Sequence, residues 1–335
     1  MSEFRIDQIT NQSGSRGPDI AGITTFTGTS GMVMPSGPTE YRGGRGRGVF
    51  GGAYDAPAAR NTLDYITMAS TGDAKDFGDL TSARSTAPMA ASSTQGLSGG
   101  GSGPVNIIDS IIISSTGNAF DFGDLTVARR YAGRVSNNIR GIWGGGDTPS
   151  AVKTIDYVTF ESKGNASDFG ELLDATSSLE ATSSPTRGLF MGGENPSVTN
   201  IITYITISTT GDAKDFGDLT SARRGAGSCS SSTRALTGGG NTGSITNIID
   251  YVTMASLGDA IDFGDLTQSR WLTTATSSPT RGLWGGGLNP GPGSEYDIID
   301  YVTIATTGNA IDFGNLQSSK RSLSSCSDAH GGLGD

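Results

Sequence analysis

Side chains suited to acid–base or nucleophilic chemistry are scarce in this chain of 335 residues. It contains one histidine, His330, and two cysteines, Cys229 and Cys326. A serine–histidine–aspartate relay is therefore excluded away from His330, and a metal site built from several histidines is excluded altogether. We interpret His330 as an ordinary polar residue of the C-terminal segment.

The cysteines and carboxylates do not form a catalytic pattern either. Cys229 and Cys326 occupy corresponding places in two sequence repeats, so we expect small buried side chains. A disulfide between them would need Cα atoms within about 7 Å. The 33 acidic residues leave a glycosidase-type pair open, but none of them stands out from the repeat. We predict that the chain is not an enzyme and binds no cofactor and no metal ion.

Two motifs formally match ligand-binding signatures. Residues 46–51, Gly-Arg-Gly-Val-Phe-Gly, fit the dinucleotide fingerprint, but they are one copy of a repeated strand element with no helix after it. The triplet Asp-Phe-Gly matches the metal-binding triplet of kinases, but it recurs without the partner motifs of a kinase. We interpret it as a turn element whose phenylalanine packs between neighbouring repeat units; a Ca²⁺ site made by its aspartates is the alternative. The triplets begin at Asp76, Asp121, Asp168, Asp215, Asp262 and Asp312.

A basic residue follows most of these triplets at a fixed distance. We expect it to form a repeated structural pair, with the aspartate of Asp-Phe-Gly accepting from it or from backbone N–H groups. The alternative is that these arginines line a central channel and bind an anion. The residues are Arg84, Arg129, Arg223 and Arg270, with Lys320 and Thr176 in the other two units.

Four short elements recur in each unit of about 47 residues. A β-branched and aromatic run, such as residues 249–254, has the composition and length of a strand. A Gly-Asp/Asn-Ala segment that we expect to be a tight turn leads from it to the Asp-Phe-Gly element. A stretch of small residues and an Arg-Gly-apolar-aromatic-Gly-Gly element complete the unit. Four strands per unit of this length predict a β-propeller blade.

The ends of the chain predict how the ring closes. The first Arg-Gly-apolar-aromatic-Gly-Gly element, at residues 47–52, precedes any Asp-Phe-Gly, whereas the last unit stops without such an element. We therefore predict an all-β, six-bladed propeller over residues 47–335, in which the N- and C-terminal strands share one blade and no sheet edge stays exposed.

Residues 1–46 are too short and too polar to form a core of their own. We interpret them as an extended N-terminal anchoring arm that binds other proteins or joins identical copies by strand addition; a disordered leader is the alternative. The apolar residues that would anchor the arm are Phe4, Ile6, Ile9, Ile20, Ile23 and Phe26.

The units differ most in the connection after the double glycine, and loops on a rigid scaffold often carry recognition. The longest departures lie at residues 288–296 and 53–61. Trp143 and Trp284 share a repeat position with phenylalanines and are expected in the core, whereas Trp271 replaces a non-aromatic residue. The predicted receptor rim comprises Trp271, Asn289, Glu295 and Tyr296.

The net charge and the hydropathy of the chain limit the kinds of partner that it can bind. A formal net charge of −10 disfavours nucleic acid, which is bound by clustered lysines and arginines. There is no run of about 18 apolar residues to span a membrane and no signal-peptide pattern. We expect synthesis in a cytoplasm.

The units resemble kelch-type propeller repeats over residues 47–335, with phenylalanine where kelch repeats usually carry tryptophan. The pattern Ile-Asp-Tyr-Val-Thr, with Gly-Asn-Ala and Asp-Phe-Gly-Asp-Leu after it, is similar to repeats in virion proteins of tailed phages, especially marine cyanophages. Segments 5–11, 14–18 and 22–28 resemble the N-termini of fibre and appendage proteins of such phages. The resemblance implies a structural virion protein (a fibre, knob or decoration protein) whose N-terminal arm binds other virion structural proteins. A host-glycan adhesin is the alternative, and a carbohydrate-cleaving enzyme is a third.

Overall fold

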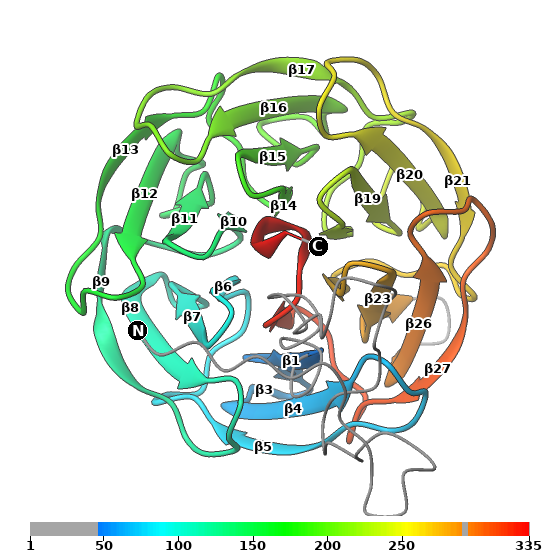
Figure 1. Ribbon diagram of the computed structural model, residues 1–335, viewed down its shortest axis with the longest axis horizontal. Helices are drawn as coiled ribbons and strands as arrows, with labels where there is room; N and C mark the ends of the chain where they lie inside the picture. Colours follow the sequence, from blue (N-terminus) through cyan, green and yellow to red (C-terminus); the bar gives the residue numbers. More distant parts are fainter. Residues whose placement is uncertain (1–45, 290–293, 335) are drawn as a thin grey trace, which may run out of the picture. The chain divides into compact units, whose positions relative to one another are not determined.

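The computed structural model describes residues 46–289 and 294–334, and these residues form an all-β, six-bladed propeller (Figure 1). Six four-stranded antiparallel sheets surround a central axis, as the repeat predicts. The anchors expected in residues 1–46 lie outside the described part of the chain.

Each blade runs from an innermost strand of small residues to an outermost strand that carries Asp-Phe-Gly. Blade 1 contains β28 (Ser324–Ser327), β1 (Arg47–Gly51), β4 (Thr62–Thr67) and β5 (Lys75–Asp79). Blade 2 contains β6 (Met89–Ala91), β7 (Gln95–Gly99), β8 (Val105–Ile112) and β9 (Phe120–Arg129). Blade 3 contains β10 (Gly133–Ser136), β11 (Arg140–Gly144), β12 (Thr154–Thr159) and β13 (Ser167–Glu171).

The remaining blades repeat this order. Blade 4 contains β14 (Glu180–Ser183), β15 (Arg187–Met191), β16 (Ile201–Thr206) and β17 (Lys214–Asp218). Blade 5 contains β18 (Gly227–Ser230), β19 (Arg234–Gly238), β20 (Ile248–Thr253) and β21 (Ile261–Asp265). Blade 6 contains β22 (Thr274–Ser277), β23 (Arg281–Gly285), β26 (Ile298–Thr303) and β27 (Ile311–Asn315). Short pairs β2 (Tyr54–Asp55) with β3 (Ala58–Ala59), and β24 (Leu288–Asn289) with β25 (Ser294–Glu295), lie in loops, and the 3-10 helix η2 (Gly331–Leu333) follows β28.

The blade that joins the two ends of the described chain is built as predicted. Strand β1 pairs with β28 from Gly48 opposite Ser327 to Gly51 opposite Ser324. The last segment of the chain thus supplies the innermost strand of the first blade. Because the ring is closed, each sheet is held between two neighbours instead of ending in a free face.

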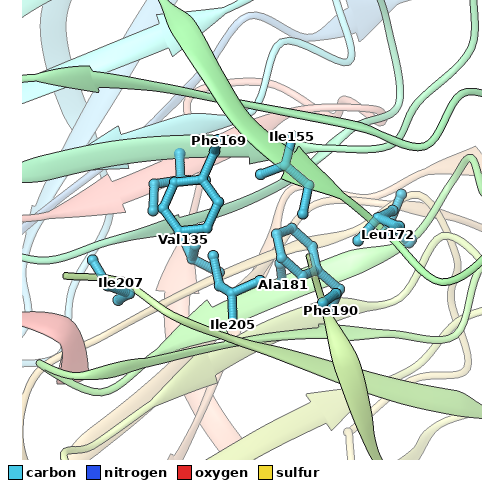
Figure 2. Close-up of a cluster of buried hydrophobic side chains, with 11 residues drawn as sticks. Val135, Ile155, Phe169, Leu172, Ala181, Phe190, Ile205 and Ile207 are labelled. Atoms are coloured by element: carbon cyan, nitrogen blue, oxygen red, sulfur yellow. The ribbon is translucent and has the colours of Figure 1, made fainter. Parts of the chain in front are cut away.

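A bulge turns each phenylalanine of Asp-Phe-Gly into the space between blades. In blade 3, Ile155 lies opposite Gly170 and Asp156 opposite Asp168, so Phe169 has no residue opposite it. Figure 2 shows Phe169 packed with residues of its own blade and of blade 4, such as Phe190 and Ile205. The predicted role of this phenylalanine is confirmed, and one such apolar cluster fills each junction between blades.

The Gly-Asp/Asn-Ala segment joins neighbouring blades, in addition to leading into its own outer strand. The Gly117 N–H donates to the carbonyl of Phe77, and the Ala119 N–H donates to that of Asp79, in the preceding blade. Between them, Asn118 Oδ1 accepts the Asp79 N–H at 3.1 Å. Only the glycine adopts positive φ, and the Asn or Asp contributes its side-chain oxygen instead of a left-handed backbone. Asn and Asp alternate here because both offer the same acceptor oxygen.

The centre of the propeller is filled by protein. Serines of the innermost strands donate to backbone carbonyls of the neighbouring blade: Ser183 to Ser136, Ser230 to Ser183, Ser277 to Ser230, and Ser327 to Ser277, at 2.6–2.7 Å. Helix η2 lies at the centre of the ring, drawn in red in Figure 1. It contacts the inner strands of blades 3, 4 and 5.

A closed ring of six backbone hydrogen bonds surrounds one end of this channel. Each N–H donates to the carbonyl of the equivalent residue in the preceding blade, at 2.7–3.4 Å. All six residues have φ between 52° and 59°, a conformation that is costly for side chains other than glycine. They are Thr86, Tyr131, Ser178, Gly225, Leu272 and Ser322. We call the end of the propeller that bears this ring the ring face.

Candidate functional site

The repeated basic residues form buried ion pairs. Each pairs with an aspartate on the third strand of the following blade, and every side chain involved is at most 2% exposed. The structural pair is therefore confirmed, and channel-lining arginines are excluded at these positions. The pairs are Arg84–Asp109 (2.9 Å), Arg129–Asp156 (2.7 Å), Arg223–Asp250 (2.9 Å), Arg270–Asp300 (2.8 Å) and Lys320–Asp64 (2.6 Å).

The partner in these pairs is not the one we expected. The aspartates of Asp-Phe-Gly are exposed, because the bulge that buries the phenylalanine turns them outwards. The paired aspartate belongs instead to the Ile-Asp-Tyr strand. In blade 3, Asp156 also accepts the Thr126 N–H and hydroxyl, at 3.2 and 2.5 Å. A charged residue repeated inside an otherwise apolar strand was the signal for it.

Burial governs the ionisation of these pairs. In the Arg223–Asp250 pair, desolvation raises the pKa of the carboxyl group and lowers that of the guanidinium, while each charge opposes the effect on the other. Both effects arise because a charge loses hydration inside the protein. These groups are therefore fold-holding elements without access to a substrate.

Arg134 takes a position that the repeat did not predict. From β10 it donates across the channel to the carbonyls of Ala181 and Ala275, both at 2.8 Å, and of Ser325 at 3.2 Å. These three carbonyls belong to blades 4, 6 and 1. One side chain therefore ties four blades together. Beside it, burial raises the pKa of Glu180 to about 8, although Arg134 counteracts this.

His330 and the cysteines are packed inside the channel. The His330 Nε2 donates to the carbonyl of Ala91 at 2.8 Å, and its Nδ1 accepts the Gly332 N–H of η2. Burial lowers the pKa of His330 to about 4. Cys229 and Cys326 are buried free thiols whose pKa values are raised by desolvation, as expected for small packed side chains. None of the three is placed to act on a substrate in solution.

The units vary most on the ring face, where Trp271 lies. A groove of about 240 Å³ there is lined by Trp271, Tyr131, Asp147, Glu194 and Arg224, among others. The Arg224 guanidinium stacks over the Trp271 indole, 5.6 Å from its centroid, and forms an ion pair with Glu194. The Trp271 Nε1 is buried and has no hydrogen-bond partner among the described residues.

The other three rim residues lie elsewhere around the same loop. Asn289 donates to the carbonyl of Ser269 at 3.2 Å. Glu295 approaches Arg321 at 3.5 Å and the Ala56 N–H at 3.4 Å, towards blade 1. Tyr296 forms backbone hydrogen bonds with Gly287 and Lys320. Trp271 thus lines the groove together with Tyr131 and Arg224. Our sequence analysis missed these two residues because it compared the loops of the units, whereas Tyr131 and Arg224 lie in other units at or next to the position of Trp271.

The remaining sequence candidates are strand residues. Residues 47–51 form β1, so the apparent dinucleotide fingerprint is a sheet strand. Trp143 and Trp284 are fully buried in the core, as predicted. Within residues 46–289 and 294–334, no group of three or more His, Cys, Asp or Glu side chains is arranged to hold a metal ion. The same part of the chain has no helix with the length and apolar character to cross a membrane.

Comparison with known proteins adds no relative: neither a family model nor a curated protein matches the chain.

Proposed function

We propose that this chain is a structural virion protein of a tailed phage, in which residues 1–46 attach a propeller that is displayed on the particle. The likeness of its repeats and of segments 5–11, 14–18 and 22–28 to phage virion proteins carries this proposal. The interior is consistent with it, because the channel is filled by Arg134, His330 and η2. What varies between units is presented at the surface, on the ring face.

A deletion tests the attachment. The full chain and a variant that lacks residues 1–40 are each expressed during infection by the phage that encodes the protein. The truncated chain is expected to keep its thermal unfolding temperature, because the described propeller begins at Gly46. It is also expected to be absent from purified particles. Ile6→Asp combined with Ile9→Asp alters the predicted anchors without shortening the arm, and this variant is expected to be absent from particles as well.

The two parts of the proposal fail differently. Normal incorporation of the truncated chain would refute the role of the arm while leaving the virion assignment standing. Absence of the full-length chain from purified particles would refute the virion assignment itself.

Recognition of a host-surface glycan is a second candidate, favoured by the groove at Trp271. Aromatic side chains beside charged groups suit a sugar ring, and Trp271 and Tyr131 line the groove together with Asp147, Glu194 and Arg224. Trp271→Ala is expected to abolish binding of those array glycans that carry the host-surface structure recognised by the groove. Ile139→Ala, which alters an exposed apolar residue in the β10–β11 connection, is expected to leave it unchanged.

A further inference from the structure

Among the six described blades, blade 4 alone lacks the buried ion pair. At the positions of the arginine and aspartate it has Thr176 and Thr203, and at the position of the threonine that caps the aspartate it has Leu173. The register shows the equivalence: Phe190 lies opposite Thr203 as Trp143 lies opposite Asp156. Both partners of the pair have therefore been replaced together.

Another paired replacement in the same chain shows a different outcome. Five blades stack an arginine on a tyrosine, such as Arg140 on Tyr157 at 4.7 Å. In blade 2 the two residues are Gln95 and Ser110, and the glutamine amide donates to the serine hydroxyl at 2.6 Å. In blade 2 the arginine–tyrosine contact is thus replaced by a direct hydrogen bond between the two new side chains. In blade 4 the two threonines are too short to meet across the space of an arginine.

A cavity of about 570 Å³ lies where the pair is missing. It is bounded by the β13–β14 connection and the β15–β16 connection, with Thr176 and Thr203 among its lining residues. Its volume lies within the range of about 300–1,000 Å³ that is usual for small-molecule sites. Adjacent residues of the same two connections, Ser177 and Glu194, line the ring-face groove instead.

One wall of the cavity carries backbone carbonyls that accept a second hydrogen bond in the other blades. In blade 3 the Arg129 guanidinium donates to the carbonyls of Thr154 and Trp143, at 2.7 and 3.2 Å. The equivalent carbonyls in blade 4 are those of Ile201, which accepts the Gly192 N–H at 3.0 Å, and of Phe190, which lies opposite Thr203 in the sheet. Among the described residues no guanidinium adds a second hydrogen bond to them, because Thr176 stands at the position of the arginine. The Thr176 hydroxyl, which donates its proton to the Asp174 carbonyl at 3.0 Å, adds an acceptor to this wall, and the Thr203 hydroxyl adds a donor and an acceptor.

The opposite wall is apolar, and charge is confined to the entrance. Leu172, Leu179 and Phe190 are all buried and line the cavity. Lys153, whose ammonium donates to the carbonyl of Leu173, and Asp174 supply one charge of each sign. A cation inside would lose hydration without the aspartate that neutralises it in the other blades. A ligand that carries many hydroxyl groups and an apolar ring face, and no net charge, matches these walls.

We infer that the cavity in blade 4 is a binding site for a neutral carbohydrate, of the size of a mono- or disaccharide. Sugar hydroxyls donate to the Phe190 and Ile201 carbonyls and to the Thr176 hydroxyl, and they exchange hydrogen bonds with the Thr203 hydroxyl. The C–H face of the ring packs on Leu172 and Leu179. This site is distinct from the Trp271 groove and does not depend on the virion role.

The chain itself provides the variant that tests the site. Thr176→Arg combined with Thr203→Asp and Leu173→Thr rebuilds the arrangement of the other blades and fills the cavity. The probes are an array of neutral glycans and then calorimetric titration of the full chain with the mono- or disaccharide that binds best. We expect binding by the wild type and a loss of more than a hundredfold in the rebuilt variant, with an unchanged or higher unfolding temperature.

Two further variants keep the test decisive if the rebuilt one folds poorly. Thr203→Val preserves shape and removes one hydroxyl, so the affinity is expected to fall about tenfold. Trp271→Ala is the matched control and is expected to leave the affinity unchanged.

Three outcomes would overturn the inference. They are no binding of any neutral glycan, equal affinity of the wild type and the Thr203→Val or rebuilt variant, and binding of free arginine that only the rebuilt variant loses. The last would identify the cavity as a site for a guanidinium ion.

Discussion

At five junctions between blades, a buried aspartate is held by a buried cation from the preceding connection. The aspartate in blade 3 illustrates the arrangement: Asp156 receives Arg129 at 2.7 Å together with the N–H and hydroxyl of Thr126. Buried ions are costly when a partner is removed, but a pair removed as a whole leaves no unbalanced charge. Blade 4, with Thr176 and Thr203, shows that the fold accepts the second case.

A double-mutant cycle in blade 3 measures this coupling. Asp156→Thr is expected to lower the free energy of unfolding by about 3–5 kcal/mol, because Arg129 is left buried without its partner. The double variant, which also carries Arg129→Thr, should lose far less free energy of unfolding than the sum of the two single effects. Urea unfolding of the wild type, the two single variants and the double variant measures this. Additivity within about 0.5 kcal/mol would contradict the coupling.

The outer strand of each blade and the Gly-Asp/Asn-Ala segment of the next blade form one structural element. The backbone of Gly78 approaches the carbonyl of Gly117 so closely that a Cβ atom on Gly78 would lie 2.4 Å from that oxygen. A side chain is therefore excluded by the neighbouring blade, beyond any preference of the backbone at φ 140°. Exposed sheet edges are avoided by the same contact.

Two glycine substitutions distinguish the effect of the close contact between neighbouring blades from the effect of backbone strain. Gly72 has φ 149°, similar to Gly78, but a Cβ atom there would meet no atom within 4 Å. Gly78→Ala is expected to destabilise the protein by about 1–3 kcal/mol more than Gly72→Ala, because the neighbouring backbone must shift. Thermal and urea unfolding of the two variants measure the difference. Equal stabilities would show that the contact between Gly78 and the neighbouring blade is not tightly packed.

In the whole molecule, the closing strand and the filled channel tie blades that are far apart in the sequence. Strand β28 completes blade 1, Arg134 joins four blades, and His330 anchors η2 to the carbonyl of Ala91. The packing of η2 in the channel is thus sensitive to the charge on the His330 imidazole. Its pKa, lowered to about 4 by burial, predicts how stability depends on pH.

Acidification is expected to destabilise the protein between about pH 6.5 and 4 through His330. In this range the unfolded chain binds a proton on the imidazole and the folded chain does not, so stability falls as the pH falls. His330→Gln removes this contribution, and its stability should fall less over the same range in urea unfolding.

Glu180 acts in the opposite direction. With its pKa raised to about 8, the folded carboxyl keeps a proton that the unfolded chain has lost, so its contribution to stability decreases as the pH rises from about 4.5 to 8. Both proteins contain Glu180, so the difference between their pH profiles isolates His330. Identical profiles would show that His330 titrates normally in the fold.

The period of the repeat and the unequal ends of the chain predicted the blade count, the four strands per blade and the closure through β1 and β28, because strand pairing follows local patterns of small, branched and turn residues. The same patterns placed the phenylalanines between blades. They also identified Arg84 and its counterparts as members of a repeated pair.

Tertiary structure decided which groups meet. Only the bulge shows that Asp168 turns outwards while Asp156 receives the arginine, since a one-residue register shift reverses which side chains are buried. The ring face, the channel spanned by Arg134 and the cavity beside Thr203 each combine residues from different blades. A repeat pattern specifies each blade separately, whereas contacts between blades depend on the closed ring in which distant segments become neighbours.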